Sequence, residues 1–182
     1  MIVIEDGSIV ASSVSYVSAV DATTYHAARG NALWSGADSV KEAALIKAAT
    51  YLDGKYRKRW KGQKAKPVIQ SMEWPRVGVR VVDTPQPYYD VPPSFYDDAY
   101  SGFLGITTIP QRLKDAQCEA ALLALSAELA PALNSSVRSE KVDILETTYA
   151  PGAKAGQVEY QAIDQLLSDY LQPLGNGTVQ RG

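Results

Sequence analysis

The sequence predicts a mainly α fold: a bundle of about four helices with a long Pro/Tyr-rich loop, a short strand or hairpin, and flexible termini. Three observations predict this class. Apolar residues recur at three- and four-residue steps, most clearly between Leu113 and Ala127. Prolines crowd residues 77–110 and exclude regular helix and most sheet positions there. Alternation typical of strands is confined to short stretches.

Length and composition set the outer limits. A chain of 182 residues with 46% apolar residues is the size of one domain with its own core, and we expect a single helical domain over 1–172 and a flexible tail over 173–182. The net charge of −2 gives no overall field toward DNA or a membrane, so any DNA contact needs a local patch. No run of eighteen apolar residues occurs, which predicts no membrane contact and a cytosolic protein when made.

The first elements are marked by turn and capping residues. The β-branched run at 1–4 predicts a strand or extended arm, closed by a turn at Asp6-Gly7. Ser18, with an acid three residues later, is a capping-box variant and begins a helix. This helix is expected to run to about Arg29, with Gly30 as its left-handed C-terminal cap.

The second predicted helix is capped by Asp38 or Ser39 and ends at Tyr56. Its apolar residues are too numerous for one narrow stripe, which predicts burial on more than one side or in a subunit contact. After it, residues 77–110 form a long loop or arm. Such a loop is normally functional or ordered by a partner, and we expect it to become ordered on assembly.

The remaining elements follow Ile109-Pro110. An Ala- and Leu-rich helix is expected over Gln111–Leu129 and should be the central packing element. Alternating residues over 140–150 predict a strand of a small hairpin or an arm. A fourth helix is expected from about Val158 to Leu171.

A basic stretch follows the second helix. Cations interleaved with aromatic rings are typical of single-strand binders, in which they neutralise phosphates and stack bases. The alternative is a solvated helix C-terminus, where cations interact favourably with the helix dipole. Trp74 is expected to fill the core, whereas Arg76 could hold an acidic partner bidentately. The candidate contacts are Lys55, Arg57, Lys58, Arg59, Trp60, Lys61, Lys64 and Arg76, with Lys66 continuing the stretch.

The long loop has the opposite charge, with no Lys or Arg from 82 to 110. Opposite-sign segments suit a head-to-tail ring in which one copy's basic patch meets its neighbour's acidic loop. They can equally meet within one subunit, so both arrangements stay open. The candidate subunit contacts are Asp83, Asp90, Tyr96, Asp97 and Asp98.

Catalytic patterns are missing from the sequence. The one histidine, His26, has no Cys, Asp or Ser at a spacing typical of a triad. Gly-rich phosphate loops, HExxH and the EF-hand pattern are absent, and a single cysteine, Cys118, excludes Cys-based zinc motifs and an internal disulfide. Cys118 lies among alanines in a helical pattern, which favours a buried small hydrophobe. We expect no enzyme, no cofactor and no metal.

The order of several short motifs resembles a known family. Ile4-Glu5-Asp6-Gly7 and Ser15-Tyr16-Val17-Ser18 are followed by Trp74-Pro75-Arg76 and then by Ile109-Pro110 before an Ala-rich helix. This order, over 1–172, resembles the small head-to-tail adaptor (connector) proteins of tailed bacteriophages, which are often labelled DnaT-like single-stranded-DNA-binding proteins.

The resemblance implies a structural virion assembly protein. Such a head completion protein forms a ring, typically twelvefold, which joins the portal to the tail and extends the DNA channel. The implied partners are the portal protein, a tail or next connector protein, further copies of the chain, and packaged DNA. The implied location is the head-tail junction of the virion, and the host cytoplasm before assembly. The alternative is a DnaT-like single-stranded-DNA-binding module that uses Lys55–Lys66.

Overall fold

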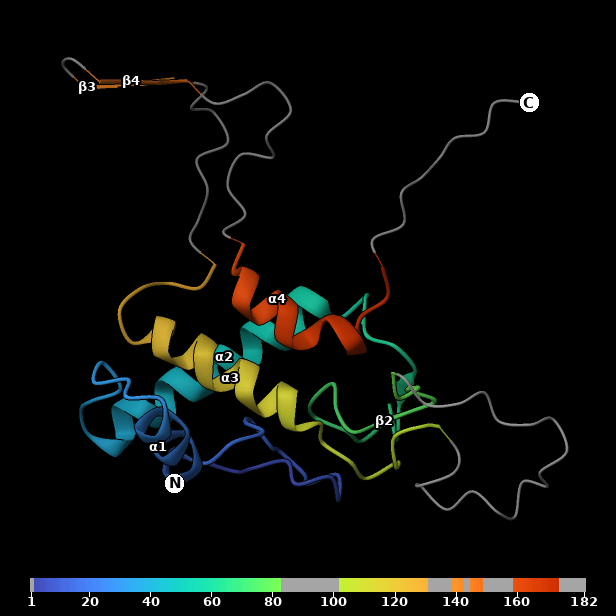
Figure 1. The fold of residues 1–182 in the computed structure, drawn as a ribbon. Helices are drawn as coiled ribbons and strands as arrows, with labels where there is room; N and C mark the ends of the chain where they lie inside the picture. The colour runs from blue at the N-terminus through green and yellow to red at the C-terminus, as the bar shows by residue number, and fades with distance from the viewer. Residues whose placement is uncertain (1, 83–101, 131–138, 143–144, 149–158, 174–182) are drawn as a thin grey trace, which may run out of the picture.

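The structure is a computed structural model that describes residues 2–82, 102–130, 139–142, 145–148 and 159–173. Its elements are four α-helices, a short 3-10 helix and two small antiparallel strand pairs, so the predicted mainly α class is confirmed (Figure 1). Most of the predicted long loop lies outside these residues, as does the end of the tail. The predicted contacts Asp83, Asp90, Tyr96, Asp97 and Asp98 lie outside them too.

The first helix, α1, spans Ala19–Ala28 and has the predicted caps. The Ser18 hydroxyl accepts a hydrogen bond from the Asp21 N–H at 3.0 Å and donates one to the Asp21 carboxylate at 2.7 Å. Gly30 has a φ of +67°, the left-handed conformation that ends many helices. Local capping chemistry therefore determines both ends of this helix.

The N-terminal arm is held by a buried carboxylate. Ile4 forms a single parallel bridge with Ser15, so the predicted strand is one bridge long. The fully buried Glu5 side chain accepts hydrogen bonds from the backbone N–H groups of Gly7, Ile9 and Val10. It also accepts one from the Ser13 hydroxyl at 3.2 Å. Glu5 thereby satisfies the N–H groups of the turn that follows the bridge.

The second helix, α2, spans Asp38–Tyr56 and packs against α3 through one broad face. Its N-cap is Ala37 without a side-chain hydrogen bond, so neither predicted cap is used. The prediction of burial on more than one side is replaced by a single wide stripe, because the buried residues recur at four-residue steps. They are Ala44, Leu45, Ala48, Ala49, Leu52 and Tyr56.

The third helix, α3, spans Gln111–Ala124 and packs against α1, α2 and α4, as expected of the central element. It ends five residues before the predicted Leu129, because the chain turns and buries Leu129 in the core. The fourth helix, α4, spans Gln161–Leu167 and continues into the 3-10 helix η2, Ser168–Tyr170.

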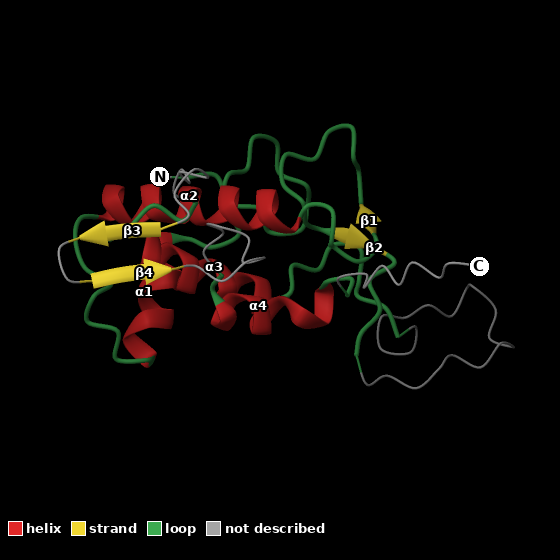
Figure 2. Cartoon of the chain, turned by 90° about the horizontal axis from the view of Figure 1, so that it is seen from above, coloured by secondary structure: helices red, strands yellow, loops and turns green. Residues whose placement is uncertain are grey.

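Two strand pairs complete the described chain. β1 (Gln63–Lys64) pairs with β2 (Arg76–Val77), and β3 (Ser139–Val142) pairs with β4 (Leu145–Thr148), in both cases antiparallel (Figure 2). The second pair confirms that a hairpin is present, but both of its strands come from the stretch predicted as a single strand. Among the described residues, no helix is long and apolar enough to cross a membrane.

Candidate functional site

A basic segment begins in the last turn of α2 and continues beyond the helix. Between residues 55 and 66 the chain carries seven of its 18 Lys and Arg residues, and no Asp or Glu occurs from 54 to 72. We call residues 55–66 the basic segment. Its cations are Lys55, Arg57, Lys58, Arg59, Lys61, Lys64 and Lys66.

The aromatic rings of the basic segment face the core. Tyr56 is fully buried and Trp60 is 2% exposed. The Trp60 ring lies 5.6 Å from that of Tyr56 and meets Trp74 edge-on at 5.7 Å, while Trp74 meets Tyr170 at 5.7 Å. The structure therefore places Trp60 in an aromatic cluster, not at a surface where a base could stack on it. Trp74 is fully buried, which confirms its predicted core role.

The C-terminal end of the domain turns Trp60 inward. Trp60 forms an antiparallel bridge with Leu171, and the Lys61 N–H donates to the Tyr170 carbonyl at 2.9 Å. The Gln172 N–H donates to the Arg59 carbonyl at 2.6 Å. Residues 59–61 thus run beside 170–172, and this pairing selects which side of the basic segment faces the core.

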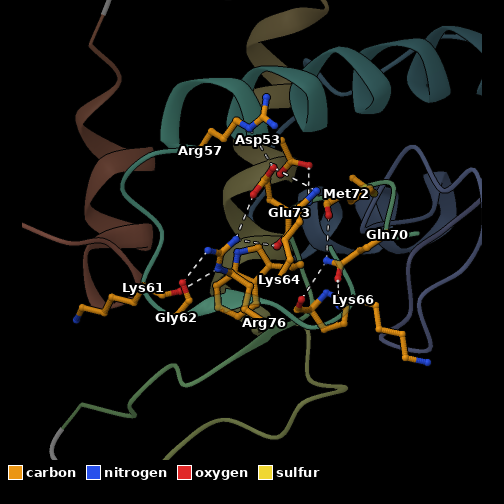
Figure 3. A network of polar contacts seen from close by, with 12 residues as sticks. Asp53, Arg57, Lys61, Gly62, Lys64, Lys66, Gln70, Met72, Glu73 and Arg76 are labelled. Atoms are coloured by element: carbon orange, nitrogen blue, oxygen red, sulfur yellow. Dashed lines mark hydrogen bonds and ion pairs between the residues drawn. The ribbon is translucent and has the colours of Figure 1, made fainter. Parts of the chain in front are cut away.

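Arg76 is buried and donates all of its described hydrogen bonds inside the protein. Its side chain is buried, and burial lowers the pKa of its guanidinium while the Glu73 carboxylate opposes that shift. Its Nε donates to the Lys61 carbonyl at 2.9 Å and its Nη2 to the Gly62 carbonyl at 2.9 Å. Its Nη1 donates to the Glu73 carbonyl at 3.2 Å and carboxylate at 3.1 Å (Figure 3). Arg76 therefore joins the loop at 61–62 to the segment at 73–76.

Glu73 also attracts two cations of the basic segment. Its Oε1 lies 3.4 Å from the Lys64 ammonium and 3.7 Å from Arg57 Nε. Arg57 nevertheless remains 76% exposed, whereas the Lys64 side chain is 20% exposed. Glu73 therefore holds Lys64 near the protein and leaves Arg57 accessible to a ligand.

Other cations of the basic segment contact the C-terminal helix. The Lys55 ammonium lies 3.4 Å from Asp164, which also accepts the Tyr56 hydroxyl hydrogen bond. The Lys61 ammonium donates to the Asp169 carbonyl at 2.9 Å. These contacts hold the basic segment on the helical core.

The basic segment keeps an excess of positive charge despite these contacts. With Arg76 it contributes eight cations, and among the described residues the carboxylates that pair with them are Glu73 and Asp164. Arg57, Lys58 and Lys66 are exposed. Exposed cations in excess of carboxylates are what a polyanion needs for phosphate contacts.

The family that this sequence matches fits the positive charge of the basic segment. A family model described as "Putative DnaT-like ssDNA binding protein" matches residues 1–182. The chain belongs to this family. No curated protein and no solved structure gives a significant match. The match confirms the DnaT-like part of the expected resemblance, and the description contains nothing about a phage adaptor.

Nothing in the sequence indicates the role of Asp53, a half-buried acid in α2. The Tyr16 hydroxyl donates to Asp53 Oδ1 at 2.7 Å and accepts from the Trp74 N–H at 3.2 Å. The Glu73 N–H donates to Asp53 Oδ2 at 3.0 Å. Burial raises the pKa of Asp53 to about 6, and the Glu73 carboxylate adds to the rise. Asp53 thus fastens both the N-terminal segment and the Trp74 segment to α2.

We expect Asp53 to make stability depend on pH. Because its folded-state pKa lies above the unfolded value of 3.8, its protonation favours the folded state at low pH, and this contribution is lost as pH rises through about 6. Urea unfolding of the native protein and of Asp53→Asn at pH 4 to 8 measures it. The native protein should lose stability relative to the variant as pH rises. Parallel curves would show that Asp53 does not titrate in this range.

His26 and Cys118 contribute to packing and not to a reactive site. His26 is buried, with Nε2 3.2 Å from the Cys118 carbonyl and Nδ1 3.1 Å from the Asn31 amide. Cys118 is 2% exposed, and burial raises the pKa of its thiol to about 12, which confirms the predicted packing role. Within the described ranges, no three His, Cys, Asp or Glu side chains are grouped so that they could hold a metal ion.

Proposed function

We propose that this protein binds single-stranded DNA through the exposed cations of the basic segment and acts without catalysis. The observation that carries the proposal is the exposed positive charge at Arg57, Lys58 and Lys66, in a chain whose family is described as single-stranded-DNA-binding. Three other lysines of the basic segment are held by contacts within the protein and add positive charge near the binding surface. They are Lys55, Lys61 and Lys64. Arg76 and Trp60 support the fold behind these residues.

The buried rings determine the kind of binding expected. Stacking of bases on aromatic side chains contributes about 1–3 kcal/mol per base in single-strand binders. With Tyr56 and Trp60 in the core, the basic segment provides phosphate contacts without such stacking. Binding should therefore be weak, independent of base sequence and strongly weakened by salt.

A matched pair of variants tests this proposal. Arg57→Gln with Lys58→Gln removes two charges from the basic segment, and Arg29→Gln with Lys47→Gln removes two exposed charges elsewhere. Fluorescence anisotropy with a labelled oligonucleotide at several salt concentrations gives the affinities. The native slope of log affinity on log salt should be about −0.7 per neutralised phosphate. The first variant should bind DNA more weakly, and its affinity should depend less steeply on salt. The second variant should match the native protein in both respects.

Equal losses of DNA affinity in the two variants would show that only the net charge of the protein matters. An affinity that does not change with salt would exclude binding through phosphate contacts. The loss of Arg57 should not affect folding enough to obscure the comparison, since its side chain is 76% exposed and exposed ion pairs contribute about 0–1 kcal/mol. Thermal unfolding of both variants checks this.

A second candidate function is that of a head-to-tail adaptor of a tailed phage. The observation that favours it is the β3–β4 hairpin, which contacts no other described element, as expected of an arm that docks on a neighbour. The motif order from Ser15-Tyr16 to Ile109-Pro110 supports it as well. In this proposal the chain forms a ring at the head-tail junction of the virion, between the portal and the tail or next connector, and is cytoplasmic in the host before assembly.

The two functions predict different partners. Co-purification with the phage's own portal protein, without affinity for free single-stranded DNA, would favour the adaptor. Salt-dependent DNA binding without a portal complex would favour the DNA-binding module. In the adaptor, the basic segment is free to meet an acidic loop of a neighbour or the packaged DNA.

A further inference from the structure

An exposed apolar turn directly follows the basic segment. Residues 67–69 lie between Lys66 and Gln70, and all three are exposed. Val68 is 94% exposed and Ile69 is 63% exposed. We call residues 67–69 the apolar turn. Turn chemistry accounts for Pro67, but not for the two β-branched apolar residues that follow it.

Hydrogen bonds hold the apolar turn in a fixed conformation. The N–H groups of Ile69 and Gln70 donate to the Lys66 carbonyl at 3.1 and 3.0 Å. The side-chain oxygen of the buried Gln70 accepts from the Lys66 N–H at 3.2 Å. Its amide nitrogen donates to the Met72 and Pro75 carbonyls at 2.9 and 3.0 Å (Figure 3). The turn is therefore anchored from inside, and a preformed contact surface loses less entropy on binding than a mobile one.

The charge around the apolar turn indicates what kind of partner covers it. No Asp or Glu occurs from 54 to 72, and the exposed Lys66 comes immediately before the turn. A matching partner combines negative charge with apolar surface. A single DNA strand has both, because its phosphates are anionic and the faces of its unpaired bases are free. In a duplex those faces are covered by stacking.

We propose that the apolar turn contacts the base faces of a single DNA strand whose phosphates lie on the basic segment. This deepens the DNA-binding function proposed above and rests on it. In other DNA-binding proteins, apolar side chains such as Ile and Pro insert between base steps. The contact takes the place of the stacking that the buried Trp60 does not provide. Because every base has such a face, the contact does not select a base sequence.

An anionic membrane surface is the other partner that combines negative charge with apolar groups. Proteins that lie on membranes present a long apolar helix face with Trp, Phe or Leu, which is a much larger apolar surface than the side chains of this turn. The description of the family names single-stranded DNA. Both observations favour DNA.

Oligonucleotides with and without bases test the contact. A labelled oligo-dT and an abasic strand of equal length carry the same phosphates. The native protein should bind the oligo-dT roughly 4- to 15-fold more tightly, as expected when about one or two methyl groups are covered. Val68→Thr with Ile69→Thr keeps both side chains branched but removes apolar groups. This turn variant should lose most of the preference and keep the native salt dependence.

A matched variant controls for the loss of exposed apolar surface. Val20→Thr with Val40→Thr makes the same kind of change at exposed positions on α1 and α2, and it should keep the native preference for bases. Equal native affinity for the two strands, or a preference that survives in the turn variant, would overturn the base contact. The phosphate-binding function would still stand if affinity falls with salt. Native protein that binds neither strand would overturn both proposals.

Vesicles of phosphatidylcholine with and without phosphatidylserine test the membrane alternative. The native protein is expected to bind neither kind of vesicle. Binding to the phosphatidylserine vesicles that is lost in the turn variant would assign the apolar turn to a membrane surface and overturn the base contact.

Discussion

Replacement of Arg76 by alanine is expected to lower the free energy of unfolding by about 3–5 kcal/mol, as expected when one partner of a buried ion pair is removed. The guanidinium donates to three carbonyl groups and to the Glu73 carboxylate, and all four acceptors lose a donor together. Glu73 would keep Lys64 at 3.4 Å and Arg57 at 3.7 Å, both farther than the 3.1 Å of Arg76, and the carbonyls of residues 61 and 62 would lose the donor that Arg76 provides.

Two control variants make the test of Arg76 specific. Arg76→Lys keeps the charge but not the planar fork that spans several acceptors, so it should recover only part of the loss. Arg57→Ala removes a cation from the same carboxylate at an exposed position and should cost about 0–1 kcal/mol. Urea unfolding measures all three. An Arg76→Ala loss no larger than that of Arg57→Ala would show that the buried contacts contribute little.

Much of the fold was predictable because its signals are local. Ser18 and Gly30 cap α1 through contacts within a few residues, and the periodic pattern after Pro110 indicates α3. Short-range alternation also indicates the strand character of 139–148, but not its division into β3 and β4. The start of α2 could not be predicted in this way, since Ala37 caps it without a side chain. The end of α3 depends on the core that receives Leu129.

The candidate site was less predictable because contacts between distant residues decide it. Cations alternate with aromatic residues in the basic segment, which is typical of a DNA-stacking surface. Whether Trp60 faces outward depends on its pairing with Leu171, more than a hundred residues away. The position of Asp53 is similar, because its partners Tyr16 and Glu73 come from separate parts of the chain. A local pattern gives charge and composition, but not the direction of a side chain.

The placement of Arg76 links the stability of the fold to the proposed DNA contact. Arg76 holds residues 61–62 beside the Glu73 segment, and Glu73 in turn lies next to Arg57. A variant that disturbs this arrangement should therefore weaken DNA binding indirectly. Substitutions at exposed Lys58 and Lys66 should change binding without changing stability, so they report on phosphate contact most directly.

Gly62→Ala is expected to destabilise the protein by roughly 2–5 kcal/mol, the sum of a left-handed backbone penalty and an overpacked contact. Gly62 has a φ of +67°, and an added Cβ would lie 2.2 Å from the Val77 carbonyl oxygen. It would also lie 2.9 Å from Val79 Cγ2. Because that carbonyl belongs to β2, relief of the clash must separate residue 62 from β2 and from the Arg76 guanidinium that binds its carbonyl.

Gly30→Ala is the matched control for Gly62. Gly30 has the same φ of +67°, yet nothing lies within 4 Å of a Cβ placed there, so its substitution should cost only the backbone penalty of about 1–2 kcal/mol. The difference between the two variants in urea unfolding therefore isolates the close approach of Gly62 to β2. If the two variants lose the same stability, the chain at 61–64 accommodates the added methyl group without an energetic cost. The bonds from Arg76 to residues 61 and 62 would then be too weak to hold the basic segment in place.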